Sequence, residues 1–160
     1  MILYNNPLLG DFIQVCAQLP QDERDQLEAF TGQPYDIDGA ALGNYMTVGP
    51  KWVLKDGETP ICIGGYVVQR PGVYRDFMLN TSEAFEKKYW FGVTRTARRT
   101  MDWILHNGAH RVECIAPARR LAARPQIEDW YKILGYNREA TLYGYCANGA
   151  DAVSFSRVRH

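Results

Sequence analysis

The order of helical and strand-like patterns along this chain predicts a mixed α/β (α+β) domain, with one sheet covered by helices. Apolar residues recur at helical spacing within residues 8–45, 93–108 and 126–135, whereas residues 51–79 alternate with the period of strands. Near the end of the chain, Asn148–Gly149 stands between two alternating segments, a strong signal for a β-hairpin. The length of 160 residues suits a single domain, so we expect one unit over 1–160.

The first half of the chain divides into short helices followed by a three-stranded antiparallel meander. Pro20, the acids that follow it, and Gly32 mark the two ends of a helix. Asp56–Gly57 is a turn signal between strands. The expected helices are 8–16, 20–32 and 37–45, and the expected strands are 51–55, 59–69 and 73–79.

The second half combines one long helix, one short helix and three strands. Ala97, Met101, Ile104 and Leu105 recur at helical spacing, which predicts a helix over 92–107 with a basic first turn. We expect residues 80–92 to connect to it and residues 117–125 to form a basic loop. The other expected elements are a strand at 111–116, a helix at 126–135, and strands at 141–147 and 151–158 joined by the Asn-Gly turn.

The composition excludes several classes of protein. Hydrophobic residues make up 46% of the chain, which excludes a disordered chain. No apolar run is long enough to span a membrane, and the N-terminus does not resemble a signal peptide. The four cysteines are far apart and are expected to be reduced, as in a cytosolic product. His106 and His110 are separated by Gly108 at the helix end, so no metal site is expected.

The formal net charge of zero conceals two oppositely charged segments. Residues 1–38 carry a net charge of −6, and residues 87–124 carry +7. Three interpretations remain open: pairing within the chain, association with a second copy or another protein, and an anion site for a nucleotide phosphate or a nucleic-acid backbone. Overall neutrality argues only against coating nucleic acid by bulk charge, so nucleic-acid contact through residues 87–124 stays open.

Two motifs carry a resemblance to a known superfamily. G-x-x-R-V-E-C at Gly108–Cys114 and W-Y-K-I-L-G-Y-N-R-E-A-T-L-Y-G-Y at Trp130–Tyr145 resemble the second half of a GNAT acyltransferase domain. The order of elements fits that fold along most of the chain. The resemblance implies a central, mostly antiparallel sheet flanked by helices, and acetyl-CoA as the acyl donor.

The resemblance also places the donor's pyrophosphate on a glycine-rich loop at the start of the long helix, where backbone N–H groups and the helix dipole hold it. The matching segment here holds a single glycine, Gly92, after the bulky Trp90 and Phe91. This departure predicts a degenerate acetyl-CoA site, in which the positive charge of arginine side chains replaces part of the missing set of backbone N–H donors. The residues that the resemblance assigns to cofactor binding are Gly92, Val93, Thr94, Arg95, Arg98 and Arg99.

Acyl transfer in this superfamily needs a general acid for the departing thiolate and a base for the amine. The acid is often a tyrosine four residues before the glycine that ends the last helix. Tyr131 stands at that distance from Gly135, and its alternative role is that of a packed helix aromatic. Asp76 and Glu113, acids on central strands, are the candidate bases. Their alternative role is pairing with neighbouring arginines.

A narrower resemblance leads to the function that the sequence predicts. PQDERDQLEAFTGQ, DFMLNT, the arginine-rich long helix and the Trp-containing helix ending in LGY resemble small GNAT-related proteins of tailed phages, mainly podoviruses. The prediction is therefore a structural, virion-associated protein without a working acetyl-CoA site, found in the virion or the host cytoplasm. It would bind copies of itself or other virion proteins through residues 85–99, with Tyr89, Trp90 and Phe91 central. The alternative is an active N-acetyltransferase that acts on an amine.

Overall fold

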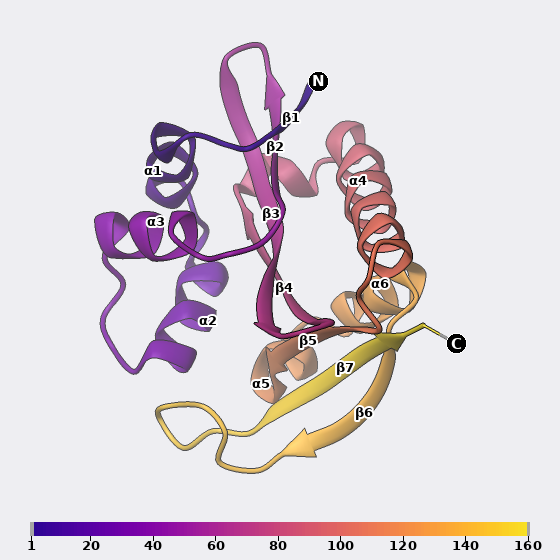
Figure 1. Ribbon diagram of the computed structural model, residues 1–160. Helices are drawn as coiled ribbons and strands as arrows, with labels where there is room; N and C mark the ends of the chain where they lie inside the picture. Colours follow the sequence, from indigo (N-terminus) through magenta and orange to yellow (C-terminus); the bar gives the residue numbers. More distant parts are fainter. Residues whose placement is uncertain (1, 160) are drawn as a thin grey trace.

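The computed structural model describes residues 2–159 and contains one seven-stranded sheet with helices on both faces (Figure 1). Helices α1, α2 and α3 lie on one side of the sheet, and α4 and α6 on the other. In chain order the elements are β1 (Ile2–Asn5), α1 (Leu9–Ala17), α2 (Gln21–Thr31), α3 (Ile37–Tyr45), β2 (Lys51–Asp56), β3 (Thr59–Arg70), β4 (Val73–Asn80), the 3₁₀ turn η1 (Ser82–Phe85), α4 (Lys87–His106), β5 (Arg111–Pro117), α5 (Ala118–Ala123), α6 (Gln126–Leu134), β6 (Asn137–Leu142) and β7 (Ala152–Val158). The mixed α/β fold class expected from the sequence is confirmed.

The strand order is β1-β2-β3-β4-β5-β7-β6, and every neighbouring pair is antiparallel except β4 and β5. These two strands run parallel and pair only between Val73–Arg75 and Arg111–Glu113. Beyond Arg75 and Glu113 the two strands are no longer paired. The sheet is therefore split at its centre, with β4 bonded to β3 on one side of the split and β5 bonded to β7 on the other.

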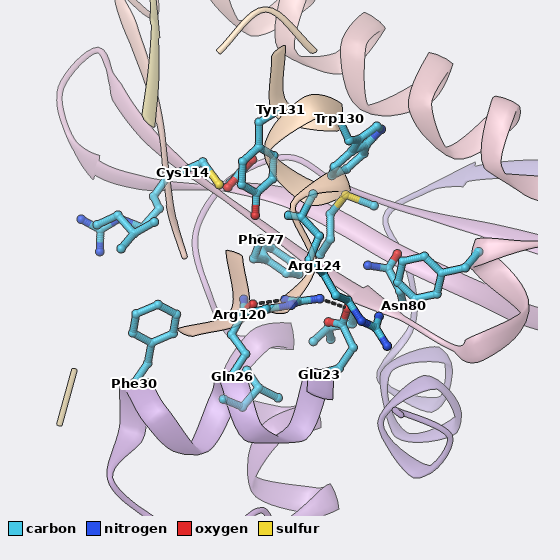
Figure 2. A pocket seen from close by; sticks show the side chains of 18 of the residues that line it. Glu23, Gln26, Phe30, Phe77, Asn80, Cys114, Arg120, Arg124, Trp130 and Tyr131 are labelled. Atoms are coloured by element: carbon cyan, nitrogen blue, oxygen red, sulfur yellow. Dashed lines mark hydrogen bonds and ion pairs between the residues drawn. The ribbon is translucent and has the colours of Figure 1, made fainter. Parts of the chain in front are cut away.

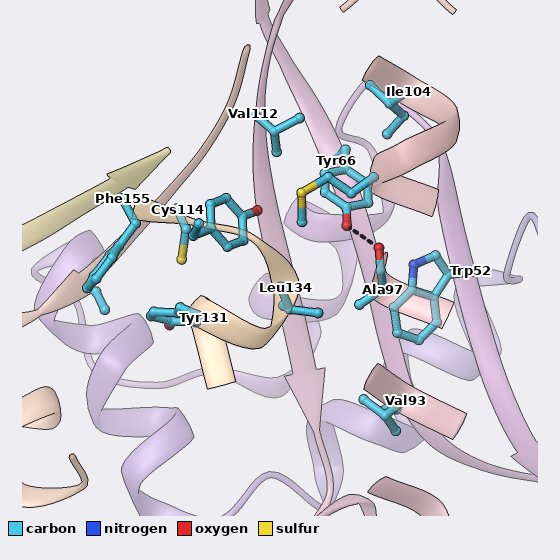
Figure 3. Packing of buried hydrophobic residues seen from close by; sticks show 14 of the residues in the cluster. Trp52, Tyr66, Val93, Ala97, Ile104, Val112, Cys114, Tyr131, Leu134 and Phe155 are labelled. Atoms are coloured by element: carbon cyan, nitrogen blue, oxygen red, sulfur yellow. Dashed lines mark hydrogen bonds between the residues drawn. The ribbon is translucent and has the colours of Figure 1, made fainter. Parts of the chain in front are cut away.

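Two apolar cores follow from the alternation of side chains along the strands. Phe12 and Val15 of α1, together with Leu19 between α1 and α2, pack on Val53, Ile63 and Leu79 of the sheet. The opposite face of the sheet packs on the buried stripes of α4 and α6, and Figure 3 shows Val93 and Ala97 beside Trp52 and Tyr66. The Tyr66 hydroxyl donates a 2.8 Å hydrogen bond to the Ala97 carbonyl, so α4 is held to β3 by a polar contact within the core.

The long helix was predicted to begin at residue 92 but begins at Lys87. The Glu86 carbonyl accepts hydrogen bonds from the amides of Tyr89 and Trp90, which starts the helix before Gly92. Tyr89 is buried and continues the stripe of Val93, Ala97 and Met101 by one further turn. The expected connection over 80–92 is therefore shorter, and its last residues are helical.

Three other boundaries differ from the sequence prediction. Residues 118–123, expected in a loop, form α5 because buried Leu121 anchors them against the core. The C-terminal hairpin exists, but β6 ends at Leu142, so Asn148–Gly149 lies in a long loop rather than in a two-residue turn. In that loop the Ala147 amide bonds to the Ala29 carbonyl of α2. Strand β1 was not predicted.

Part of the segregated charge is neutralised within the chain. Arg120 and Arg124 of the basic segment form ion pairs with Glu23 and Asp22 at the start of α2. Intramolecular pairing therefore accounts for some of the asymmetry, whereas Arg95, Arg98 and Arg99 on α4 are exposed. No helix within residues 2–159 is both long and apolar enough to cross a membrane. The four cysteines are unbridged and buried.

Candidate functional site

A cavity of about 490 Å³ passes through the sheet where β4 and β5 separate. One end lies against α2 and the loop between β6 and β7, and the other lies against η1, α4 and α6. Its lining residues thus come from both faces of the sheet. They are Glu23, Gln26, Leu27, Phe30, Asn44, Arg75, Asp76, Phe77, Met78, Leu79, Asn80, Phe85, Trp90, Cys114, Ile115, Arg120, Arg124, Gln126, Ile127, Trp130, Tyr131 and Tyr145.

Asp76 is half-buried at the point where β4 leaves β5, and its side chain lies on the sheet face covered by α4 and α6. The Tyr136 hydroxyl donates a 2.6 Å hydrogen bond to its carboxylate. Burial raises the pKa of Asp76 from 3.8 to about 6, although the hydrogen bonds from Tyr136 and the Cys114 thiol oppose the shift. A carboxylate with such a pKa is ionised at neutral pH and can still exchange a proton.

Tyr131 reaches the same place from α6. Its side chain is buried, and Figure 2 shows its hydroxyl pointing into the cavity above Phe77 and Arg120. A hydrogen bond joins it to the thiol of Cys114 on β5, and burial raises the pKa of Tyr131. The Arg120 guanidinium opposes that shift by its positive charge. Asp76, Cys114 and Tyr131, from three different elements, therefore form one connected polar group at the middle of the cavity.

Glu113, the other candidate base, lies on the opposite face of the sheet from Asp76. Its carboxylate pairs with the guanidinium of Arg111 at 2.8 Å and with that of Arg75 at 3.5 Å. It is not among the described residues that line the cavity. The structure thus brings Asp76 and Tyr131 together but leaves Glu113 in a surface ion-pair network.

The segment expected to form a phosphate-binding loop is helical. Gly92 and the residues that follow it, up to Arg99, lie within α4, and none of them is among the described lining residues of the cavity. Val93 is fully buried in the core, and the Thr94 hydroxyl bonds to the Trp90 carbonyl. Arg95, Arg98 and Arg99 point to the surface. A helix therefore occupies the position at which the resemblance places a phosphate-binding loop, because α4 begins five residues before Gly92.

Aromatic rings close the α4 end of the cavity. The ring centroid of Trp90 lies 5.0 Å from that of Trp130 and 5.4 Å from that of Phe85. Trp130 Nε1 also donates a 3.0 Å hydrogen bond to the Thr94 hydroxyl, which ties α6 to α4. The gap between these two helices is thus filled by side chains of the chain itself.

The α2 end of the cavity holds a buried ion pair that the sequence did not indicate. Glu23 Oε1 accepts a 2.5 Å hydrogen bond from Arg120 Nη2, and Arg120 also contacts the Gln26 amide oxygen. Burial raises the pKa of Glu23, and the charge of Arg120 opposes that shift. The segregation of acids and bases along the chain was the available signal, but it did not specify the partners. Residues 2–159 contain no cluster of three His, Cys, Asp or Glu residues placed to hold a metal.

No protein-family model matches this chain, and no curated protein matches it by sequence. The structure, however, is similar to solved acetyltransferases over its whole length. It matches ribosomal-protein-alanine N-acetyltransferase from Brucella melitensis with a TM-score of 0.75 and 11% identity, covering 99% of this chain and 100% of that one. An N-acetyltransferase from Staphylococcus aureus gives 0.73 and 11%, with coverage of 99% of each chain. A mutant of spermidine N-acetyltransferase from Vibrio cholerae gives 0.69 and 16%, with coverage of 99% and 95%.

These likenesses establish the fold. The chain is a single α/β unit with the GNAT acetyltransferase fold, as the motifs at Gly108–Cys114 and Trp130–Tyr145 indicated. At 11–16% identity they establish no more than the fold. Activity must therefore be argued from the cavity of this chain.

Proposed function

We propose that this chain transfers an acyl group from an acyl-coenzyme A thioester to an amine. One observation carries the proposal: Asp76, Cys114 and Tyr131 meet in a single cavity where β4 and β5 separate. The cavity has lining residues from both faces of the sheet, so an acceptor can approach from the α2 side, and a donor that displaces the Trp90–Trp130 contact can approach from the α4 side. Several structural neighbours are N-acetyltransferases, which supports the same reaction class.

Asp76 is the proposed base. Because its pKa is about 6, the carboxylate is charged at pH 7 and can take a proton from an ammonium ion that enters the cavity. The Tyr136 hydroxyl fixes the carboxylate by its 2.6 Å hydrogen bond. The raised pKa keeps the carboxylate basic enough for this transfer, which an exposed aspartate near pKa 3.8 is not.

Tyr131 is the proposed acid, because its hydroxyl points into the cavity that Asp76 also lines. Its pKa lies above the ordinary value, so it carries a proton at neutral pH and can give it to a departing thiolate. Cys114 joins Tyr131 and Asp76 by hydrogen bonds and positions both groups.

The residues fit the reactive end of the donor better than its diphosphate. The thioester supplies an activated acyl carbon. After Arg75 the edge of β4 is no longer paired with β5. Backbone groups of residues 76–80 are therefore free to form hydrogen bonds with the amide groups in the extended arm of the acyl-coenzyme A donor. For the diphosphate, the first turn of α4 offers the side chains of Lys87 and Lys88 in place of a glycine-rich loop.

The test is thiol release from acetyl-CoA in the presence of a panel of primary amines, with binding measured by calorimetry. Asp76→Asn is expected to lower kcat about 100-fold at pH 7, and Tyr131→Phe about 10-fold or more. Glu113→Gln is the matched control, since it alters an acid on the neighbouring strand outside the cavity. Absence of both acetyl-CoA binding and thiol release would contradict the proposal.

A second candidate is a non-catalytic protein of a larger assembly, such as a phage virion. The observation that favours it is the closed α4 end of the cavity, where a helical turn and the Trp90–Trp130 contact occupy the place of a phosphate-binding loop. If the protein has this non-catalytic role, we expect millimolar acetyl-CoA to leave its melting temperature unchanged. A ligand present at 100 times its Kd would add about 2.7 kcal/mol to the stability.

A further inference from the structure

We propose that the acceptor is a small primary amine on an apolar, ring-sized body that carries no second positive charge. This inference rests on the proposed acyltransferase function and names its substrate class. It follows from two properties of the α2 end of the cavity: an aromatic wall formed by segments far apart in sequence, and a shortage of free carboxylates.

The aromatic wall consists of Phe30 on α2 and Tyr145 in the β6–β7 loop. Their ring centroids lie 6.4 Å apart in an edge-to-face arrangement. The hydrogen bond from the Ala147 amide to the Ala29 carbonyl, 2.8 Å long, fixes that loop on α2 and so holds Tyr145 over the cavity. Leu27 and Phe77 continue the apolar surface toward Asp76. An aromatic or branched aliphatic group is the complement of such a wall.

The charges of the lining residues oppose a polycation. Among the described residues, three arginines, at positions 75, 120 and 124, and two carboxylates, those of Glu23 and Asp76, line the cavity. Glu23 is already engaged by Arg120. The three arginines are paired as well, with Glu113, Glu23 and Asp22. One carboxylate, Asp76, therefore remains for one ammonium group, and a second ammonium would find no free counter-charge in the lining.

The size of the cavity limits the acceptor further. About 490 Å³ is in the range of pockets for small ligands, and the reactive end of the donor must share that space. The shared volume favours a compact acceptor over a long peptide. The residues at this end thus select one ring-sized group next to one amine.

The experiment compares 2-phenylethylamine, ethylamine and spermidine as acceptors with acetyl-CoA. We expect kcat/KM for 2-phenylethylamine to exceed that for the other two at least tenfold. Phe30→Glu adds a carboxylate to the aromatic wall. It should lower kcat/KM for 2-phenylethylamine at least tenfold and raise it for spermidine. Ile133→Glu, on the exposed side of α6 and outside the described cavity lining, is the matched control and should change neither value.

Tyr145→Glu repeats the test from a loop position, in case Phe30→Glu does not fold, which circular dichroism reports. Preference for spermidine over 2-phenylethylamine in the unmodified chain overturns the inference and leaves the acyltransferase proposal standing. If no amine is acetylated, the acyltransferase proposal fails, and binding decides the inference. In that case a rise in melting temperature with 2-phenylethylamine alone, lost in Phe30→Glu or Tyr145→Glu, supports it. No such rise overturns it.

Discussion

The indole rings of Trp90 and Trp130 lie with their centroids 5.0 Å apart, so the N-terminal part of α4 and the middle of α6 touch at one end of the cavity. The hydrogen bond from Trp130 Nε1 to the Thr94 hydroxyl supports this contact. Any donor that approaches the Asp76–Tyr131 pair from this side must pass or displace these two rings. If the proposed acyltransferase function is correct, we expect this contact to limit donor binding as well as to stabilise the α4–α6 junction.

Trp90→Ala should weaken the fold but strengthen donor binding. Loss of a half-buried indole, with its contacts to Phe85 and Trp130, is expected to cost about 1–3 kcal/mol of unfolding free energy. The rise in melting temperature caused by acetyl-CoA should be larger than in the unmodified chain, because the α4 end is open. Trp103→Ala is the control, since Trp103 lies on the same helix and is 58% exposed. Equal rises in Trp90→Ala and the unmodified chain would show that the contact does not limit access.

Tyr136→Phe should shift the pH dependence of acyl transfer upward. The Tyr136 hydroxyl stabilises the charged form of Asp76, so it lowers a pKa that burial raises to about 6. Without this hydrogen bond the pKa of Asp76 rises further, and the acidic limb of the kcat/KM profile moves to higher pH. Tyr143→Phe, at an 84% exposed tyrosine, should leave the profile in place. An acidic limb that moves to lower pH, or does not move, would falsify the assignment of Asp76 as the base.

Asp76→Asn should stabilise the fold at pH 8. Because burial raises the folded-state pKa of Asp76 from 3.8 to about 6, the folded chain holds this proton more tightly than the unfolded chain. Ionisation of Asp76 therefore lowers the unfolding free energy of the chain. This loss grows as the pH rises from 3.8 to 6 and reaches its full size above that range. Removing the charge should gain about 1–3 kcal/mol at pH 8 and less at pH 4.5.

Urea unfolding at both pH values measures this gain. Glu58→Gln, in the exposed turn between β2 and β3, serves as the control and should not change stability at either pH. An aspartate whose charge strengthens the fold would give the opposite sign, with Asp76→Asn less stable at pH 8. Lower activity together with higher stability is the expected behaviour of a functional residue.

Periodicity predicted the meander and most helices because each strand or helix buries one face. The same periodicity could have located the start of α4, since Tyr89 continues the stripe of Val93, Ala97 and Met101. The resemblance placed a phosphate-binding loop there instead, but burial of the apolar stripe favours the helix. In the C-terminal hairpin, Asn148–Gly149 favours a two-residue turn. The loop instead extends to α2, where the Ala147 amide bonds to the Ala29 carbonyl.

The candidate site was only partly accessible from sequence. Tyr131 followed from its distance to Gly135, and Asp76 from its place on a central strand. The choice between Asp76 and Glu113 depends on strand register, because Arg75 is opposite Glu113 and Asp76 faces the other way. The contact of Glu23 with Arg120 joins residues 97 positions apart, and no local pattern specifies such a pair.

Arg120→Leu should destabilise the fold strongly, because it leaves Glu23 buried without a counter-charge. The expected loss is about 3–5 kcal/mol in urea unfolding at pH 7. The double variant Glu23→Leu, Arg120→Leu should recover most of this loss, since two apolar groups replace a buried pair. Lys132→Leu breaks the exposed pair with Asp129 and should change stability by at most about 1 kcal/mol. A double variant no more stable than Arg120→Leu would indicate that the charge of Glu23 is not the source of the loss.

Self-association through residues 85–99 stays a prediction. The burial of some of these residues in the fold reduces the set that can contact a second copy. Of the three aromatic residues predicted to be central, Tyr89 is buried and Trp90 is half-buried, so Phe91, which is 68% exposed, is the one most available to a second copy. The Arg95 guanidinium lies 4.4 Å from its ring centroid, and Arg98 and Arg99 extend the basic surface. Sedimentation should show a mass above one chain at low salt that falls as salt screens the opposed charges. Phe91→Ser should give the mass of a single chain, and Trp103→Ser should not change the association. A single-chain mass for the unmodified protein at every salt and protein concentration would contradict the prediction.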